Sequence, residues 1–234
     1  MATTTFPASS AESELTERVA ANLATLRERI AAAGSDPSRV RVVAVTKTFG
    51  PEAVRAAVAA GLGAVGENYL VELERKRALL DDVAVAWHYL GALQSNKIAR
   101  VAAVSDVICS VSRAKEIDRL AALGATRRLY VQVDFTDLAQ RNGAAPDEVA
   151  ELVARARDRG LGIVGLMTVA PADARGAEHS FRETARLADE LGLEERSMGM
   201  SDDLELACRW GTSEVRVGRA LFGPRARRAI PPLA

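Results

Sequence analysis

The chain has 234 residues, a length that suits one domain with a large core and is typical of an α/β barrel. Lys and Arg together number 31, as do Asp and Glu, so the formal net charge is zero. This balance argues against a general nucleic-acid-binding surface, which needs an excess of positive charge. No apolar run is long enough to span a bilayer, so the sequence predicts no membrane insertion either.

The two ends of the chain differ from its body. Residues 1–10 lack the basic start and apolar core of a signal peptide, and we expect a flexible tail. Residues 225–234 are basic and Pro-rich, which is typical of a second solvated tail. Residues 11–224 contain no linker or low-complexity segment and are expected to form one domain. Cys109 and Cys208 lie in apolar stretches without metal-ligand spacing, which predicts reduced, buried thiols in a cytoplasmic protein and no metal site.

The first strong element is a helix over residues 11–33. Apolar residues recur at spacings of four, four, three and four, and build one stripe made of Leu15, Val19, Leu23, Leu26 and Ile30. A strand-then-helix rhythm follows. The strands are expected at 40–46, 64–67, 86–90, 107–111, 129–134, 162–168, 196–200 and 214–217. The clearest helices between them are expected at 51–60, 113–123, 146–159 and 174–191.

Two architectures fit this rhythm. Several strands are nearly continuous apolar runs, as strands buried on both faces should be. A doubly wound open sheet is one solution, and a closed barrel is the other. Because the strands number eight and no GxGxxG follows the first, we predict a single (β/α)8 barrel with an extra N-terminal helix.

Active sites of such barrels lie at the C-terminal ends of the strands. Lys47 follows the apolar run VRVVAV and so emerges from a buried strand into the barrel mouth. Partial desolvation there favours a nucleophilic amine that suits a Schiff base. The alternatives are a lysine that reaches solvent or one that pairs with Glu67.

The segment after the last strand has the features of a phosphate site. Gly218 and Arg219 begin a short helical turn, and barrels often bind phosphate beyond strands seven and eight. Ser201, after strand seven, can donate its hydroxyl there or cap a helix at 202–209, and both roles can coexist. Arg216 alternates with two valines and points into the barrel, where it needs a ring nitrogen, a phosphate or a buried carboxylate such as Glu67 as its partner. His88, on strand three, is interpreted as a core residue.

Several motifs spread over residues 12–224 are together specific to one family. They are AVTKT (44–48), GENY (66–69), WHYLGALQSNK (87–97), GLMT (165–168), SMGMSDD (197–203) and VRVGRALFG (215–223). With them the chain resembles the pyridoxal phosphate homeostasis protein family, also described as the proline synthetase co-transcribed type. Members have no firmly established enzymatic activity and are linked to the balance of pyridoxal 5′-phosphate (PLP) and amino-acid pools.

The resemblance implies a fold similar to the N-terminal domain of alanine racemase, with PLP held as an aldimine on Lys47. It places Asn68 beside the cofactor and Arg216 at the pyridine nitrogen. It implies that Ser201 and Gly218 hold the phosphate, together with the adjoining backbone of Met200 and Arg219. The sequence departs from the family at Arg141, where members often have Lys. Because Arg and Lys differ in geometry, a role for this position does not carry over directly.

The residues favour a cofactor carrier over an enzyme. An arginine at the pyridine nitrogen donates a hydrogen bond and leaves the ring a weak electron sink, which disfavours transamination. Racemisation needs acid–base groups on both faces of the substrate, and nothing in the sequence places Tyr69, Tyr89 or Tyr130 opposite Lys47. A PLP-dependent racemase or other PLP enzyme remains an alternative, as does a barrel that binds another phosphate ester. We expect a monomer whose candidate protein partners are PLP-dependent apoenzymes.

Overall fold

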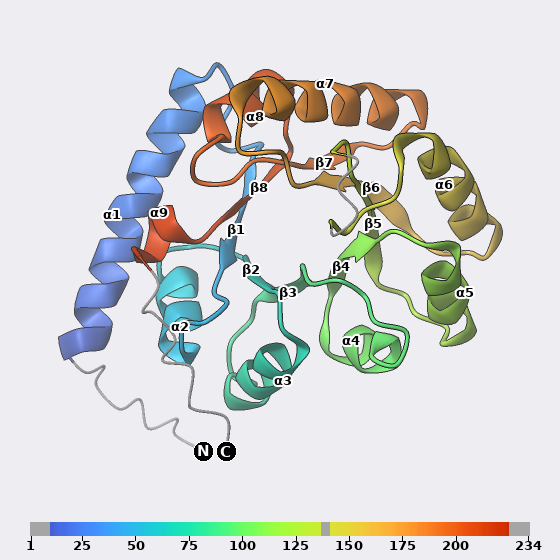
Figure 1. Ribbon diagram of the computed structural model, residues 1–234. Coiled ribbons are helices and arrows are strands. Elements are labelled where there is room, and N and C mark those ends of the chain that lie inside the picture. Colours follow the sequence, from blue (N-terminus) through green and yellow to red (C-terminus); the bar gives the residue numbers. More distant parts are fainter. Residues whose placement is uncertain (1–9, 137–140, 225–234) are drawn as a thin grey trace, which may run out of the picture.

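The computed structural model describes residues 10–136 and 141–224, and within them eight parallel strands close into a barrel (Figure 1). Each strand pairs with the next in the chain, and the last pairs with the first through the register Val43 to Arg216. The strands are β1 (Arg41–Val45), β2 (Ala64–Glu67), β3 (Ala86–Tyr89), β4 (Val107–Val111), β5 (Arg128–Val133), β6 (Ile163–Thr168), β7 (Glu195–Ser197) and β8 (Glu214–Val217). This closure confirms the predicted barrel and overturns the doubly wound alternative.

Helices surround the barrel and alternate with its strands (Figure 1). They are α1 (Ser10–Ala32), α2 (Pro51–Ala59), α3 (Leu70–Leu79), α4 (Ile98–Val104), α5 (Ala114–Ala122), α6 (Val149–Asp158), α7 (Ala174–Glu190), α8 (Leu204–Arg209) and α9 (Arg219–Phe222). The helix predicted at 146–159 is divided, because the 3-10 turn η1 (Pro146–Glu148) precedes α6. Pro146 occupies the first position of that turn, where its missing N–H costs nothing.

Side chains alternate along each strand and so separate two apolar regions. The larger region lies between the strands and the helices and includes Val42 and Ala44 of β1. A smaller cluster fills the barrel interior and consists of Val107, Cys109, Tyr130 and Met167. Cys109 and Cys208 are both buried free thiols, as the sequence predicts.

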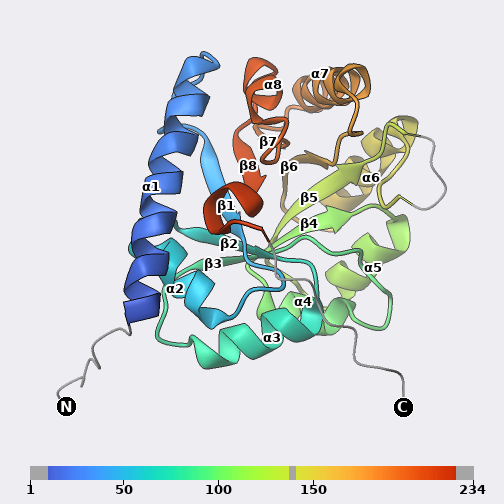
Figure 2. The same ribbon diagram turned by 60° about the vertical axis from the view of Figure 1, so that its left-hand side comes forward.

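The extra N-terminal helix runs along the outside of the barrel beside α2, α8 and α9 (Figure 2). Its apolar stripe is buried at Val19, Leu23, Leu26 and Ile30, which confirms the predicted 3.6-residue period. The tails predicted at 1–10 and 225–234 lie outside the described residues, except for Ser10, which begins α1. No helix in 10–136 or 141–224 combines the length and the apolar character that crossing a membrane requires.

Strand β7 is shorter than the predicted 196–200 segment. Gly199 adopts φ +96°, in the left-handed region, and so turns the chain out of the strand. Hydrogen bonds to β8 nevertheless continue on both sides of this turn, from Met198 N to Glu214 O (3.0 Å) and from Arg216 N to Gly199 O (3.0 Å). The segment 200–203 therefore leaves the barrel edge at a defined place, beside β8.

Candidate functional site at the barrel mouth

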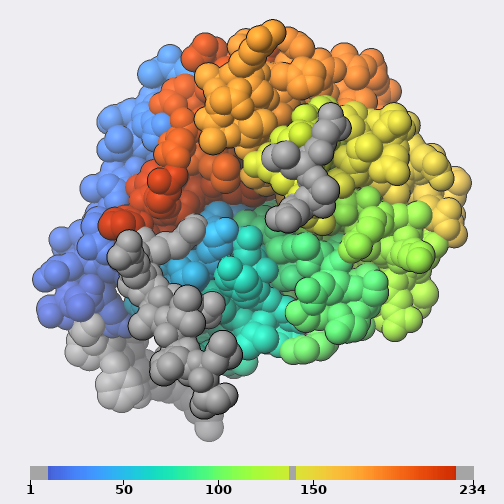
Figure 3. Space-filling view, in the orientation of Figure 1, coloured from blue at the N-terminus to red at the C-terminus, as the bar shows by residue number. Residues whose placement is uncertain are grey.

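A cavity of about 920 Å³ opens at the C-terminal ends of the strands. Figure 3 shows this face hollowed near its centre, between the red C-terminal segments and the blue and cyan segments that follow β1 and β2. The structure brings all the residues predicted for the site into this one cavity: Lys47, Asn68, Met200, Ser201, Arg216, Gly218 and Arg219. Residues of β1, β6 and β8 and of the loops after β1, β2, β6 and β7 therefore converge on one space.

A second cavity, of about 750 Å³, lies at the opposite end of the barrel. Its lining includes Arg41, Ala86 and Arg128, the first residues of β1, β3 and β5. In (β/α)8 barrels the N-terminal end serves stability, and the C-terminal end carries the chemistry. The cavity that contains Lys47 is therefore the candidate site, although both cavities have a similar size.

Lys47 is half-buried and lies in a tight turn directly after β1. Phe49 N donates to Thr46 O (3.0 Å) and closes the turn, and Thr48 N donates to Glu72 Oε2 (2.8 Å). Thr48 adopts φ +69°, a left-handed conformation that a β-branched residue rarely takes and that costs on the order of 1–3 kcal/mol. Strained backbone next to a candidate nucleophile indicates that the surrounding structure holds this lysine in place.

A buried ion pair lies behind that turn. Lys76 Nζ, on α3, is 2.5 Å from Glu67 Oε1 and donates to Thr46 O (2.7 Å), while Thr46 Oγ1 donates to the same Glu67 oxygen (2.6 Å). Burial raises the pKa of Glu67, and the cation of Lys76 and the hydrogen bonds oppose that shift. Glu67 therefore has Lys76 as its ion-pair partner, and the hypothesis that it pairs with Arg216 is wrong, because Arg216 bonds to Ser197 and Thr168 instead.

Asn68 follows β2 and reaches the cavity from the side next to Lys47. Its carbonyl oxygen lies against Gly91, where a Cβ atom would stand only 2.1 Å away. The chain after β3 must therefore have glycine at this position for the two loops to approach each other. This close contact sets the place of the Asn68 backbone at the cavity wall.

The loops after β7 and β8 meet at the side of the cavity where the phosphate was predicted. Ala220 N donates to Ser201 Oγ (3.3 Å), so the serine hydroxyl lies at the first turn of α9 and beside Gly218. The alternative that Ser201 caps a helix at 202–209 is wrong, since α8 begins at Leu204 with Asp203 at its N-cap position. Met200 N donates to Asp203 Oδ1 (2.5 Å), and Arg219 pairs with Asp202 at the surface.

The N-terminal helix supports this corner of the cavity. Arg29 donates to both carboxylate oxygens of Glu205 (2.6 and 3.0 Å) and to Ser201 O (3.0 Å). Asn22 Nδ2 donates to Leu221 O (2.8 Å) in α9. The extra helix thus fixes both segments of the predicted phosphate corner, a function that the apolar stripe alone did not reveal.

Arg216 is buried, and its guanidinium points into the barrel as strand alternation predicts. Nη1 donates to Ser197 O (2.6 Å) and Ser197 Oγ (2.8 Å), and Nη2 donates to Thr168 O (2.7 Å). Burial lowers the pKa of Arg216, and the negative charge of Glu214 counteracts this effect. An arginine remains protonated in such an environment because its ordinary pKa lies far above neutral pH.

His88, Cys109 and Glu214 form a buried cluster below Arg216. His88 Nδ1 is 3.8 Å from Cys109 Sγ and 3.7 Å from Glu214 Oε2. Both oxygens of Glu214 already accept hydrogen bonds, from Ser197 Oγ (2.7 Å) and from Arg41 Nη1 (3.2 Å). Arg41 competes for the carboxylate that a metal ion would need. We therefore interpret the cluster as hydrogen-bonded core, consistent with the interpretation of His88 as a core residue.

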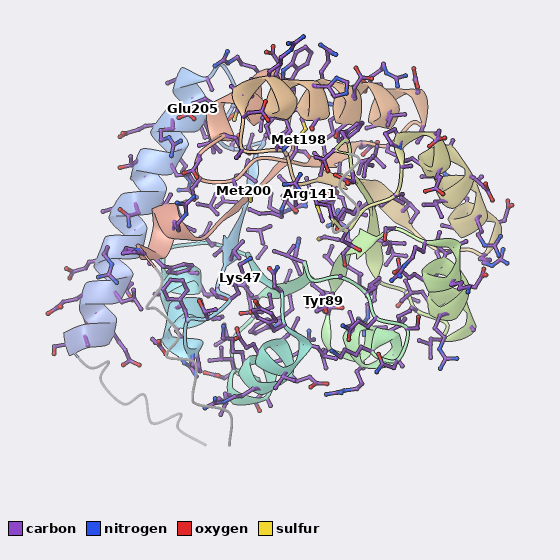
Figure 4. All side chains as sticks on the ribbon, viewed as in Figure 1. Lys47, Tyr89, Arg141, Met198, Met200 and Glu205 are labelled. Carbon is purple, nitrogen blue, oxygen red and sulfur yellow. The ribbon has the colours of Figure 1, made fainter. Side chains whose placement is uncertain are left out.

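Arg141 is a cavity residue that the motifs did not place. Its two Nη atoms donate to Val169 O (3.1 Å) and Ala170 O (3.3 Å), so it fastens the loop after β6 at the cavity wall. In Figure 4, Lys47 lies on one side of the central opening, and Arg141 and Met200 lie on the other. The only sequence signal was the departure from the family pattern. Further charged lining residues that the sequence did not indicate are Glu178, Glu205 and Arg209.

Comparison with known proteins places the chain. The model of the alanine racemase N-terminal domain matches residues 16–226. A protein of Pseudomonas aeruginosa named pyridoxal phosphate homeostasis protein is 40% identical over 222 residues, covering 91% of this chain and 96% of the relative. This chain belongs to the pyridoxal phosphate homeostasis protein family. A member of the family from Deinococcus radiodurans is also 40% identical, over 87% of this chain and 99% of the relative.

Solved structures agree with the family assignment. PipY of Synechococcus elongatus, solved without PLP, is 33% identical and superposes with a TM-score of 0.79, covering 88% of this chain and all of PipY. The structure of PipY with PLP bound gives a TM-score of 0.76. Alanine racemase from Corynebacterium glutamicum superposes with a TM-score of 0.72 at 17% identity, so it shows the shared fold alone. This chain covers 62% of that racemase.

Proposed function

We propose that this protein binds PLP in the cavity at the C-terminal ends of the strands, linked to Lys47 as a Schiff base, and serves intracellular PLP homeostasis as a cofactor carrier. The observation that carries the proposal is the convergence of Lys47, Arg216 and the Ser201–Gly218 corner on one cavity. The names of its relatives and the PipY structure with PLP bound support it.

The residues of the cavity fit the chemistry of PLP. When bound, the cofactor supplies an aldehyde, and the amine of Lys47 can condense with it with loss of water. The Ser201 hydroxyl and the backbone at Gly218 and Arg219 would hold the phosphate, because N–H and O–H donors favour an anion. Arg216 would donate to the pyridine nitrogen, and Asn68 would lie beside the ring. Met200 contributes wall area, since its own amide donates to Asp203.

The geometry favours carriage over catalysis. An arginine at the pyridine nitrogen donates a proton in a hydrogen bond but does not protonate the ring, so carbanions are poorly stabilised. Racemisation would need a second acid–base group opposite Lys47. None of the three tyrosines, all within the described residues, lines the cavity. Tyr89 donates to Ala92 O (3.4 Å), and Tyr130 donates to Glu195 inside the barrel.

Absorption spectroscopy combined with reduction tests the linkage. Purified protein loaded with PLP should show a visible absorbance band that borohydride removes, and mass mapping should locate the reduced adduct on Lys47. The variant Lys47→Ala should lose the band. The exposed Lys115 on α5 provides the control, and Lys115→Ala should keep the band. An adduct on another lysine, or no band in the parent protein, would contradict the proposal.

Assays with amino acids separate a carrier from an enzyme. PLP-loaded protein is incubated with L-alanine and L-serine, and the products are resolved by chiral chromatography. Turnover of about 1 s⁻¹ or more, the lower end of ordinary enzymes, would establish the racemase alternative instead. A carrier should instead transfer PLP to a PLP-dependent apoenzyme, whose recovered activity measures the transfer. We further propose that the protein is monomeric and cytoplasmic.

A further inference from the structure

A line of hydrogen bonds connects the cavity to a carboxylate deep inside the barrel. Arg216 Nη1 donates to Ser197 Oγ (2.8 Å), and Ser197 Oγ donates in turn to Glu214 Oε1 (2.7 Å). Glu214 and Ser197 are fully buried, and Arg216 is 5% exposed. Since Glu214 and Arg216 are two residues apart on β8, both side chains point into the barrel.

The acceptors that hold Arg216 directly are neutral. They are the carbonyl oxygens of Ser197 (2.6 Å) and Thr168 (2.7 Å) and the Ser197 hydroxyl. These bonds orient the guanidinium, but a buried cation also requires a counter-charge in a medium of low dielectric constant. The groups that act on its charge are Cys109 of β4, Tyr130 of β5, Asp203 and Glu214. Glu214 has the largest effect among them.

The other charged or titratable neighbours of Glu214 contact its second oxygen, Oε2, and not the oxygen that Ser197 binds. Arg41 contacts Glu214 Oε2 (3.2 Å), but it also pairs with Glu195 (3.0 Å). Glu195 in turn pairs with Arg128 and accepts a hydrogen bond from the hydroxyl of Tyr130. Burial lowers the pKa of His88, the third neighbour, and this favours its neutral form. Arg41 thus divides its contacts between Glu214 Oε2 and Glu195, while Glu214 Oε1 accepts from Ser197.

We propose that Glu214, acting through Ser197, is a positioning residue that orients and charge-balances Arg216 for contact with the pyridine nitrogen of PLP. This inference rests on the proposed function. It extends the cofactor site to two side chains that do not touch the cofactor. Without the carboxylate, Ser197 loses the acceptor that directs its lone pair toward Arg216, and the guanidinium loses its balancing charge.

A comparison of two ligands isolates this effect. The probes are PLP and its benzene analogue, in which C–H replaces the ring nitrogen while the aldehyde and phosphate remain. The change in the ratio of their dissociation constants between parent and variant measures the effect of the substitution on the contact at the ring nitrogen, because the intrinsic difference between the ligands cancels. Glu214→Gln should reduce the preference for PLP about fivefold or more, since a hydrogen bond from a charged donor loses its alignment. Ser197→Ala should change the ratio in the same direction.

A matched control variant makes the outcome decisive. Glu195→Gln removes a nearby carboxylate that contacts Arg41, Arg128 and Tyr130 and has no direct hydrogen bond to Ser197 or Arg216. It should lower stability but leave the ligand ratio unchanged. A purely structural role for Glu214 would weaken both ligands equally, and an unchanged ratio in Glu214→Gln and Ser197→Ala overturns the inference. If Glu214→Gln does not fold, an unchanged ratio in Ser197→Ala, which keeps the carbonyl acceptor, still overturns the inference.

The failure of this inference is distinguishable from failure of the proposed function. If the parent protein shows no PLP band at all, the proposed function is wrong. If the band and the Lys47 adduct are present but the ligand ratio responds equally to Glu195→Gln and Glu214→Gln, only the role of Glu214 is refuted.

Discussion

Lys76 and Glu67 form a buried ion pair, 2.5 Å between Nζ and Oε1, directly behind the turn that carries Lys47. The pair joins α3 to the end of β2, and its cation also binds the carbonyl oxygen of Thr46. The lysine proposed to bind the cofactor is therefore held in place by a second lysine that does not line the cavity. This arrangement leads to the first two predictions.

Lys76→Met should lower the free energy of unfolding by about 3–5 kcal/mol at pH 7, because it leaves the carboxylate of Glu67 buried without its cation. Urea denaturation followed by circular dichroism measures the change. Lys115→Met, at an exposed position on α5, should change the free energy by less than about 0.5 kcal/mol. Equal effects of the two substitutions would refute a structural role for the pair.

The cost of Lys76→Met should depend on pH. Burial already raises the pKa of Glu67, and loss of the cation raises it further. An acid whose pKa is higher in the folded state stabilises the protein below its unfolded pKa, about 4.3, and this contribution is lost as pH rises. The difference between parent and variant should therefore be small near pH 4 and grow toward pH 7. In Glu67→Gln/Lys76→Met this dependence should disappear, and its persistence would assign it to another group.

Arg29→Met should weaken PLP binding although Arg29 does not line the cavity. Its bonds to Glu205 and to Ser201 O fix the predicted phosphate corner from α1. We expect a loss of about fivefold in affinity, equivalent to about 1 kcal/mol, since the ion pair is partly exposed. Titration followed by the visible band measures the change. The exposed Arg55, which pairs with Asp82, is the control, and Arg55→Met should bind PLP as the parent does.

Gly199→Ala should destabilise the protein more than an alanine at another left-handed glycine. Gly199 has φ +96°, and a Cβ there would lie 2.6 Å from Ala207 Cβ. Left-handed backbone costs alanine about 1–2 kcal/mol, and overpacking adds about 1–3 kcal/mol. Gly124 has φ +60°, and a Cβ there would meet no atom within 4 Å, so Gly124→Ala measures the conformational cost alone. In thermal unfolding, Gly199→Ala should have a clearly lower melting temperature than Gly124→Ala. An equal decrease in the two variants would contradict the crowding argument.

Much of the fold is predictable from local patterns in the sequence. The predicted strands agree with β1 to β8 within one or two residues at most ends, because buried parallel strands are continuous apolar runs between glycines and prolines. The exception is the C-terminal end of β7, where Gly199 turns the chain while the apolar pattern continues to Met200. The residues proposed for the cavity could also be predicted from the sequence, since a barrel places the C-terminal ends of its strands at one mouth.

The partners of the buried charged residues could not be predicted from the sequence. Glu67 was considered as a partner for Lys47 or Arg216, and the structure pairs it with Lys76, which the sequence did not suggest. Arg216 reaches a carboxylate only through Ser197. Arg141 fastens a loop that begins 28 residues further along the chain. Charge and hydrogen-bonding capacity are properties of a residue type, whereas the identity of a partner depends on which helix packs against which strand.

The sequence by itself determined the order of the strands and helices, the lysine at the first strand end and the motifs that place the chain in its family. Only the tertiary structure decided that β1 and β8 close the barrel, that α1 supports the corner at Ser201, and that Lys76, Ser197 and Glu214 hold the cavity residues from behind. The physical reason is range. Apolar periodicity and turn residues act over a few neighbours, whereas buried ion pairs and barrel closure join segments that are distant in the chain and near only after folding.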